Sequence, residues 1–138
     1  PFLHMKAGGS VCPPSYFTVD NKMHYLHQEG RTVFKYAVSS MSDVSAAIAE
    51  KNGLTKDSIN WIVPHQANQR IIDFASTKLK GPKEKFYLNI HKYGNTSSAS
   101  IPIALDELNR AGKLHRGDLL LLPAFGGGLA SACCLVRW

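Results

Sequence analysis

Short apolar runs alternate with helical repeats along most of this 138-residue chain, and this alternation limits the possible fold more than any other feature. Runs rich in β-branched, aromatic and leucine residues predict strands over residues 59–63, 86–90, 119–123 and 130–138. Apolar residues at steps of three and four predict helices over residues 32–51, 66–80 and 97–110. Strands that alternate with helices favour right-handed crossovers and a mixed, mostly parallel sheet with helices packed on it. The predicted fold class is therefore α/β.

The two ends of the chain depart from this alternation. Only a short connection, Phe125-Gly126-Gly127-Gly128, separates the last two strands, so we expect the final strand to run antiparallel to its neighbour. Residues 1–31 contain several glycines and prolines and no sustained period, which indicates a loop or edge segment. We assign this leading segment to the same domain as residues 32–138.

The charge balance and hydropathy narrow the classes of partner. Lys and Arg number 16 against 10 Asp and Glu, which gives a net charge of +6 and favours an anionic partner. The basic residues are scattered from Lys6 to Arg137 without a basic helix or an aromatic RNA-binding signature, which argues against nucleic acid. No apolar run approaches the roughly 20 residues that a membrane-spanning helix needs. We therefore expect a soluble protein, and one cut from a longer polypeptide because it begins at Pro1.

Cysteine and histidine usage predicts neither disulfides nor a metal site. Cys12, Cys133 and Cys134 form no disulfide framework and no CxxC motif, which favours a reducing, cytoplasmic compartment. The two cysteines in the last strand are interpreted as small buried hydrophobic residues. His24 and His27 lie three residues apart without a nearby cluster of acids or thiols, so they are interpreted as surface or loop residues.

Three loops that follow predicted strands carry the candidate site. They are Pro64-His65-Gln66-Ala67-Asn68, Tyr93-Gly94-Asn95-Thr96-Ser97 and Phe125-Gly126-Gly127-Gly128. Loops at the carboxyl ends of parallel strands lie at one edge of the sheet, so we expect these three to converge. An imidazole and a carboxamide both supply N–H donors, and no carboxylate lies in these loops to act as a metal ligand. Such a site suits an oxyanion or an enolate.

Each of these residues alone has a structural interpretation. His65 could cap the helix that follows it, and Asn95 after Gly94 could be a turn residue with a positive φ angle. The three glycines could form a tight connection between strands. Only the arrangement of all three loops favours a functional site.

The same three motifs resemble, in order and spacing, the carboxyl-terminal half of β-ketoacyl-acyl-carrier-protein synthase III, and the likeness extends from about Gly30 to Trp138. The resemblance implies a thiolase-like fold built from two similar halves. It also implies a homodimer that condenses a short acyl-coenzyme A with malonyl-acyl carrier protein. Coenzyme A and phosphopantetheine thioesters would be substrates, and no cofactor or metal is implied.

The resemblance also assigns roles to individual residues. It implies that His65 and Asn95 bind the malonyl thioester carbonyl and stabilise the enolate formed on loss of carbon dioxide. Gly127 would offer its backbone amide to the acyl oxyanion, and Phe125 would pack beside His65 and help to keep it neutral. Asn68 and Gly30 would contact the pantetheine arm.

Three basic residues match positions implicated in docking the acidic carrier protein, namely Lys35, Arg70 and Lys78. The alternative is that these three are solvated residues on helix surfaces.

The chain departs from the family pattern in one respect. The family's nucleophilic cysteine begins a helix in the amino-terminal half, and none of the present cysteines matches it. We therefore expect the chain alone to lack acyl transfer, and its apolar core to continue into the missing half. Two alternatives stay open: a related enzyme of secondary metabolism with another acyl donor, and a non-catalytic thiolase-like binding module.

Overall fold

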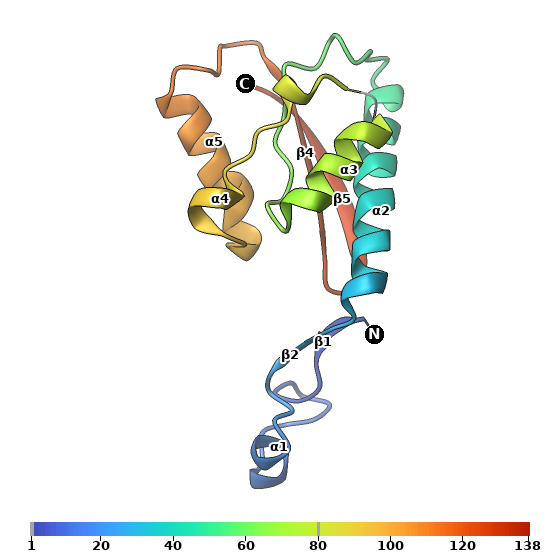
Figure 1. Ribbon diagram of the computed structural model, residues 1–138, viewed down its shortest axis with the longest axis vertical. Helices are drawn as coiled ribbons and strands as arrows, with labels where there is room; N and C mark the ends of the chain where they lie inside the picture. The colour runs from blue at the N-terminus through green and yellow to red at the C-terminus, as the bar shows by residue number, and fades with distance from the viewer. Residues whose placement is uncertain (1, 80) are drawn as a thin grey trace.

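The computed structural model describes residues 2–79 and 81–138, so Pro1 and Lys80 lie outside the described residues. A body that contains the larger helices and the main sheet carries a projecting arm, defined here as residues 2–28 (Figure 1). The elements, with 3₁₀ turns labelled η, are β1 (Leu3–Met5), α1 (Tyr16–Asp20), β2 (Leu26–Gln28), α2 (Gly30–Lys51), β3 (Trp61–Ile62), α3 (Gln69–Leu79), η1 (Lys83–Lys85), α4 (Ile90–Tyr93), η2 (Ser97–Ala99), α5 (Ser100–Arg110), β4 (Leu119–Gly126) and β5 (Ala130–Arg137).

The main sheet has the strand order β3-β4-β5. Strands β3 and β4 are parallel, with Trp61 opposite Leu120. Strands β4 and β5 form a long antiparallel hairpin that runs from Leu119 opposite Arg137 to Gly126 opposite Ala130. The predicted α/β class with a mixed sheet and an antiparallel last strand is confirmed.

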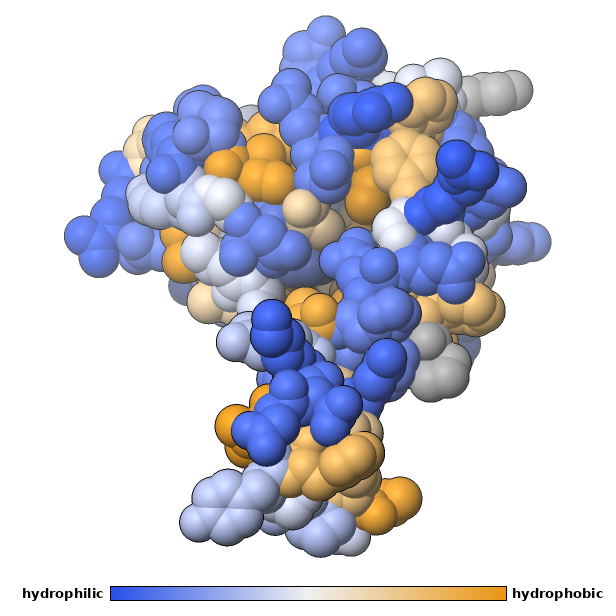
Figure 2. Space-filling model, turned by 60° about the horizontal axis from the view of Figure 1, so that its bottom comes forward, coloured by the Kyte–Doolittle hydropathy of each residue, from blue (hydrophilic) through white to orange (hydrophobic). Residues whose placement is uncertain are grey.

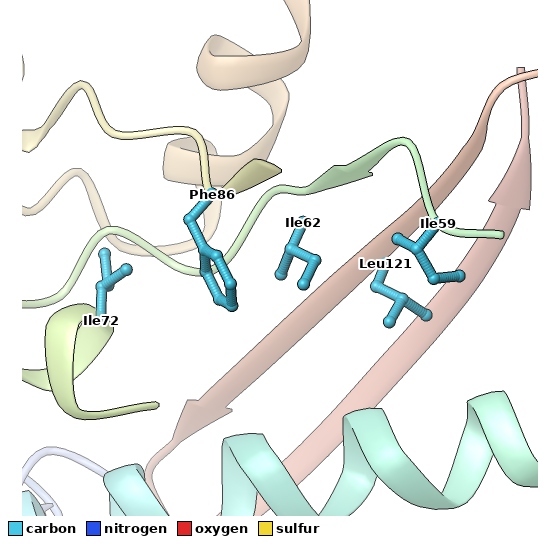
Figure 3. Close-up of a cluster of buried hydrophobic side chains, with 5 residues drawn as sticks. All are labelled: Ile59, Ile62, Ile72, Phe86 and Leu121. Carbon is cyan, nitrogen blue, oxygen red and sulfur yellow. The ribbon is translucent and has the colours of Figure 1, made fainter. Parts of the chain in front are cut away.

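Helices cover both faces of the sheet, with α5 on one side and α2 and α3 on the other (Figure 1). Successive side chains of a strand point to opposite faces, so neighbouring apolar residues enter different cores. Leu120 packs with Ala104 and Leu108 of α5. Leu121 belongs to the opposite core, a cluster that extends through Ile62 and Phe86 to Ile72 of α3 (Figure 3). Burial on both faces explains why this strand is apolar at successive positions rather than alternating.

The strand predicted over residues 86–90 is wrong beyond its first residue. Phe86 makes one parallel bridge to Ile62, and α4 begins at Ile90, where the sequence predicted a strand end followed by a loop. The side chain of Gln66 accepts hydrogen bonds from the backbone N–H groups of Asn89 and Ile90. A side chain therefore supplies the partners that a neighbouring strand would otherwise provide.

The three long helices are confirmed with small shifts at their ends. Helix α2 begins at Gly30, two residues before the predicted start. Helix α3 begins at Gln69 instead of residue 66, because the Asn68 side chain accepts the backbone N–H of Arg70 and caps the first turn. Its predicted end at Lys80 lies outside the described residues. Helix α5 begins at Ser100 after the turn η2.

The arm contains more regular structure than a loop. Strands β1 and β2 pair antiparallel with His4 opposite His27, and Ser15 and Thr18 form a capping box at the start of α1. Many of its large apolar side chains are exposed, namely Phe2, Met5, Val11, Tyr16, Phe17, Val19, Tyr25 and Leu26. Figure 2 shows apolar surface gathered on this projection. The arm therefore has little core of its own.

The remaining expectations concern cysteines, histidines and helices. Cys133 is half-buried but Cys134 is exposed, so the interpretation of both as buried residues is wrong for Cys134, which lies on the other face of β5. His27 is exposed, whereas His24 Nε2 lies 2.9 Å from Thr18 Oγ1. Within residues 2–79 and 81–138, no helix has the length and apolar character needed to cross a bilayer.

Candidate functional site

A large open cavity of about 1320 Å³ lies where the arm meets the body. Strands β1 and β2 and the start of α2 form one part of its wall. The three loops singled out in the sequence form another part, through His65 and Asn68, Asn95, and Phe125 with Gly127, and residues of α3, α5 and β5 complete the wall. Residues of all three predicted loops therefore line one cavity. The second loop follows α4 and not a strand, and the expected end of the strand at residue 123 is wrong because Phe125 and Gly126 still belong to β4.

His65 follows β3 and enters the cavity from a half-buried position. Its backbone N–H donates to the carbonyl of Pro123 on β4, which continues the strand pairing past β3. The ring of Phe125 packs edge-on against the imidazole with 5.6 Å between the ring centroids. Burial lowers the pKa of His65 below its ordinary value of 6.5, so the imidazole is neutral near pH 7.

Ser100 contacts His65 from the first position of α5. Its Oγ lies 2.7 Å from His65 Nδ1 and also accepts the backbone N–H of Gln66 at 3.2 Å. The side chain is 2% exposed, so these contacts are shielded from water. The sequence did not single out Ser100. Its position at the predicted start of a helix next to a candidate loop was the available signal.

Asn95 enters the same cavity from an exposed turn. Its side-chain Oδ1 accepts the backbone N–H of Ser97 at 2.9 Å. No residue in the described part of the chain hydrogen-bonds to the Nδ2 amide group, which therefore stays available as a donor. The positive φ angles lie at Gly94 (69°) and Ser97 (54°), so the structural interpretation of Asn95 as the positive-φ residue is wrong.

A cluster around Glu107 holds the turn that leads to Asn95. The carboxylate of this α5 residue accepts hydrogen bonds from Asn89 Nδ2, Lys92 Nζ and the hydroxyls of Tyr87 and Tyr93, at 2.7 to 3.1 Å. Hydrogen bonds from Lys92, Asn89 and the two tyrosines lower the pKa of Glu107 to about 2. The sequence analysis missed this cluster, which fixes α4 against α5.

Gln66 joins the His65 loop to the segment before α4. The side chain is 1% exposed. Its Nε2 donates to the carbonyls of Pro64 and Tyr87, while its Oε1 accepts the two N–H groups at the start of α4. All its hydrogen-bonding capacity is used inside the protein. The loops that carry His65 and Asn95 are therefore connected by one buried carboxamide.

The other residues predicted for the site divide into two groups. Gly30, Asn68, Phe125 and Gly127 line the cavity together with His65 and Asn95. The basic residues do not line it and lie exposed on two packed helices, Lys35 on α2 and Arg70 and Lys78 on α3.

Two of these basic residues have local partners. Lys78 Nζ lies 2.8 Å from Asp43 Oδ1, and the guanidinium of Arg70 lies 6.0 Å from the centroid of the Phe34 ring. Within residues 2–79 and 81–138, no group of His, Cys, Asp and Glu side chains could hold a metal ion.

Comparison with known proteins decides the family. A profile described as 3-oxoacyl-[acyl-carrier-protein (ACP)] synthase III C terminal matches residues 49–138, which is more than half of the chain. The chain belongs to this family. Within the synthase III family, the β-ketoacyl-[acyl-carrier-protein] synthase III 2 of Bacteroides thetaiotaomicron is 65% identical over 138 residues, and a synthase III of Phocaeicola vulgatus is 62% identical.

Both matches cover 100% of this chain but only 41% of the relative, so the chain spans about two fifths of the length of these curated synthases. The crystal structure of a 3-oxoacyl-[acyl-carrier-protein] synthase III from Aquifex aeolicus superposes with a TM-score of 0.81 and 50% sequence identity. That superposition covers 83% of this chain and 37% of the other. The predicted thiolase-like half is confirmed.

Proposed function

We propose that the full-length protein condenses an acyl-coenzyme A primer with malonyl-acyl carrier protein, the step that initiates fatty acid biosynthesis, and that this chain supplies the malonyl site. One observation carries the proposal. His65 and Asn95 line the same cavity, and each has one end of its side chain held by the protein. His65 Nε2 and Asn95 Nδ2 have no hydrogen-bond partner among the described residues. Both atoms are therefore available to donate to one substrate oxygen.

The chemistry that this pair supports is a decarboxylative Claisen condensation. The bond between the malonyl α-carbon and its carboxylate breaks, carbon dioxide leaves, and the electron pair moves into the thioester as an enolate. N–H groups of His65 and Asn95 stabilise the negative oxygen. The α-carbon of the enolate then attacks an acyl thioester, and the thiolate that held the acyl group leaves.

The residues that line the cavity support a neutral His65 that stabilises an enolate, and they supply no charged carboxylate that could act as a general base. No Asp or Glu of the described residues lines the cavity, so no carboxylate there favours a protonated imidazole. The ring of Phe125 covers one side of His65 and helps to keep it neutral. In the proposed mechanism the backbone amide of Gly127 binds the oxyanion of the acyl group.

The acyl group itself needs a nucleophile from elsewhere. Cys12 lies on the arm, Cys133 and Cys134 lie on β5, and none of the three lines the cavity. We place the acylated cysteine in the part of the full-length protein outside this chain. The chain alone would then be inactive in acyl transfer.

The carrier protein would approach over the basic helices. Lys35 and Arg70 are exposed near the starts of α2 and α3, where Gly30 and Asn68 form part of the cavity wall, whereas Lys78 is exposed in the last turn of α3. In this proposal the three cations dock the acidic carrier protein, while Gly30 and Asn68 contact its pantetheine arm. The full-length protein would act as a homodimer in the cytoplasm, and the arm would share the domain of residues 32–138.

Substitution of the two donors tests the proposal. In the full-length protein, we expect His65→Ala and Asn95→Ala each to reduce release of carbon dioxide from malonyl-acyl carrier protein by ~10² or more, the effect of losing an oxyanion donor. Asn109→Ala, at the exposed end of α5, serves as the matched control and should keep the parental rate. Parental rates in both donor variants would show that the proposal is wrong.

A panel of acyl-coenzyme A primers supplied to the same full-length protein separates fatty acid initiation from a related condensation in secondary metabolism. Short primers should be preferred.

A further inference from the structure

Only one of the two ring nitrogens of His65 has a hydrogen-bond partner among the described residues. Nδ1 lies 2.7 Å from Ser100 Oγ, and no hydrogen bond from the described residues reaches Nε2. A neutral imidazole carries its proton on one nitrogen and a lone pair on the other. The position of that proton therefore decides whether the cavity meets a donor or an acceptor.

The hydrogen-bonding capacity of Ser100 settles the position of the proton. The hydroxyl is buried and has a single hydrogen to donate. Its oxygen already accepts the backbone N–H of Gln66. Within the described residues, His65 Nδ1 is the one acceptor that the hydroxyl reaches. Buried polar hydrogens are nearly always donated, so the serine O–H points to Nδ1 and the imidazole proton resides on Nε2.

We infer that Ser100 is a positioning residue that holds neutral His65 in the Nε2–H tautomer and so presents a hydrogen-bond donor to the cavity. This inference rests on the proposed function only for its effect on the reaction. An enolate oxygen gains from an N–H group at Nε2, whereas the lone pair of the other tautomer would repel it. The lowered pKa of His65 is consistent with a neutral ring.

The neighbouring donor is oriented in the same way. The backbone N–H of Ser97 occupies the acceptor atom of the Asn95 carboxamide, as the Ser100 hydroxyl occupies the acceptor atom of the imidazole. Residues 97–100 thus satisfy both acceptors and leave both donors for the cavity. Residues 97–100 therefore determine that both side chains present hydrogen-bond donors to the cavity, although these two hydrogen bonds involve no reacting atom.

Nitrogen NMR of the full-length protein, labelled with ¹⁵N-histidine, tests the inference directly. At about pH 8, above the ordinary histidine pKa of about 6.5, the spectra report which nitrogen carries the proton. The variant His65→Ala lacks the His65 signals and thereby assigns them. We expect the proton on Nε2 in the parent, and a clear population of the Nδ1–H tautomer in Ser100→Ala.

Two further variants serve as controls. Ser42 is 2% exposed, like Ser100, but its hydroxyl donates to the carbonyl of Val38 within α2. Ser42→Ala should therefore keep the parental tautomer. Ser100→Thr retains a hydroxyl at the same place and should also keep it, which separates loss of the hydroxyl from loss of packing.

The rate of malonyl decarboxylation gives a second measurement. We expect Ser100→Ala to lower it about 10- to 100-fold, by analogy with the partners that orient metal-bound imidazoles. Ser42→Ala should leave the rate unchanged.

Either of two results would overturn the inference: a parent with its proton on Nδ1, or a Ser100→Ala protein with the parental tautomer. If Ser100→Ala does not fold, the parent spectrum and Ser100→Thr still decide the question. A parent that shows the Nε2–H tautomer but no decarboxylation refutes the proposed function and leaves the tautomer assignment standing. Loss of activity in His65→Ala with an unchanged tautomer in Ser100→Ala refutes the inference alone.

Discussion

The loop that carries His65 is buried among polar groups, whereas the turn that carries Asn95 lies at the surface. His65 is held by Ser100 and followed by the fully buried Gln66. Asn95 is exposed and depends on a short turn and on the Glu107 cluster behind it. A half-buried ring is fixed by neighbours that exclude water. An exposed carboxamide needs charged hydrogen bonds, which are stronger than neutral ones, to hold its turn.

Gln66 lies in the His65 loop and hydrogen-bonds to the segment before the Asn95 turn, so its substitution should affect both regions and have the largest effect. Gln66→Leu retains much of the volume but leaves two N–H groups and two carbonyls without partners. We expect the free energy of unfolding of the full-length protein to fall by about 4 kcal/mol or more, since four buried groups lose their partner and each costs about 1–3 kcal/mol. Denaturant titration measures this change.

Gln69→Leu is the matched control, because Gln69 is exposed at the start of α3. A Gln66 variant as stable as the Gln69 variant would show that the two loops are not linked through this side chain.

Glu107→Gln should affect the Asn95 turn and spare the His65 loop. We expect a loss of about 1–3 kcal/mol, the range for hydrogen bonds to a charged group. The folded protein lowers the pKa of Glu107 from 4.5 to about 2, so the stabilisation is complete above pH 4.5 and is lost as the pH falls from 4.5 to 2. The difference in unfolding free energy between parent and variant should therefore shrink across that interval.

Equal differences at pH 7 and pH 2 would contradict the role given to the ionised carboxylate. Unchanged ¹⁵N signals of His65 in this variant would show that the effect of Glu107 is confined to the Asn95 turn.

Lys78→Ala should have the smallest effect and provides a baseline outside both loops. Its ion pair with Asp43 is exposed on both sides. Exposed pairs contribute about 0.2–1 kcal/mol, so thermal unfolding should change little. Binding of acyl carrier protein should weaken at low salt in the same variant if Lys78 docks it. A loss of stability as large as that of Glu107→Gln would contradict this ranking.

The sequence predicted correctly the elements whose formation depends on neighbouring residues. The period of α2 and the apolar runs of β4 and β5 are properties of neighbouring residues, and these elements are found where expected. Residues 86–90 have a strand-like composition, but Gln66, twenty and more residues earlier, takes the hydrogen bonds that would define a strand. The spacing of apolar residues within 86–90 cannot show that a distant side chain replaces a neighbouring strand as the hydrogen-bond partner.

The candidate site shows the same division. The motifs around His65 and Asn95 were visible because they interrupt regular elements. Glu107 was missed because it lies inside an ordinary amphipathic helix, where nothing in the sequence distinguishes it from solvated residues, and Ser100 had only its place after a candidate loop as a signal. Their partners come from segments between 14 and 35 residues away, and only the packing of α5 brings them together.

The arm gives the cavity a wall that is encoded separately from its donors. Leu3 and Met5 of β1 and Leu26 and Gln28 of β2 face the space that His65 and Asn95 also enter. These wall residues come from one pair of antiparallel strands, and none of the hydrogen bonds that orient the two donors involves them. A change of shape in this arm of fewer than thirty residues would therefore alter which ligands the cavity admits, while the hydrogen bonds that orient His65 and Asn95 stay the same.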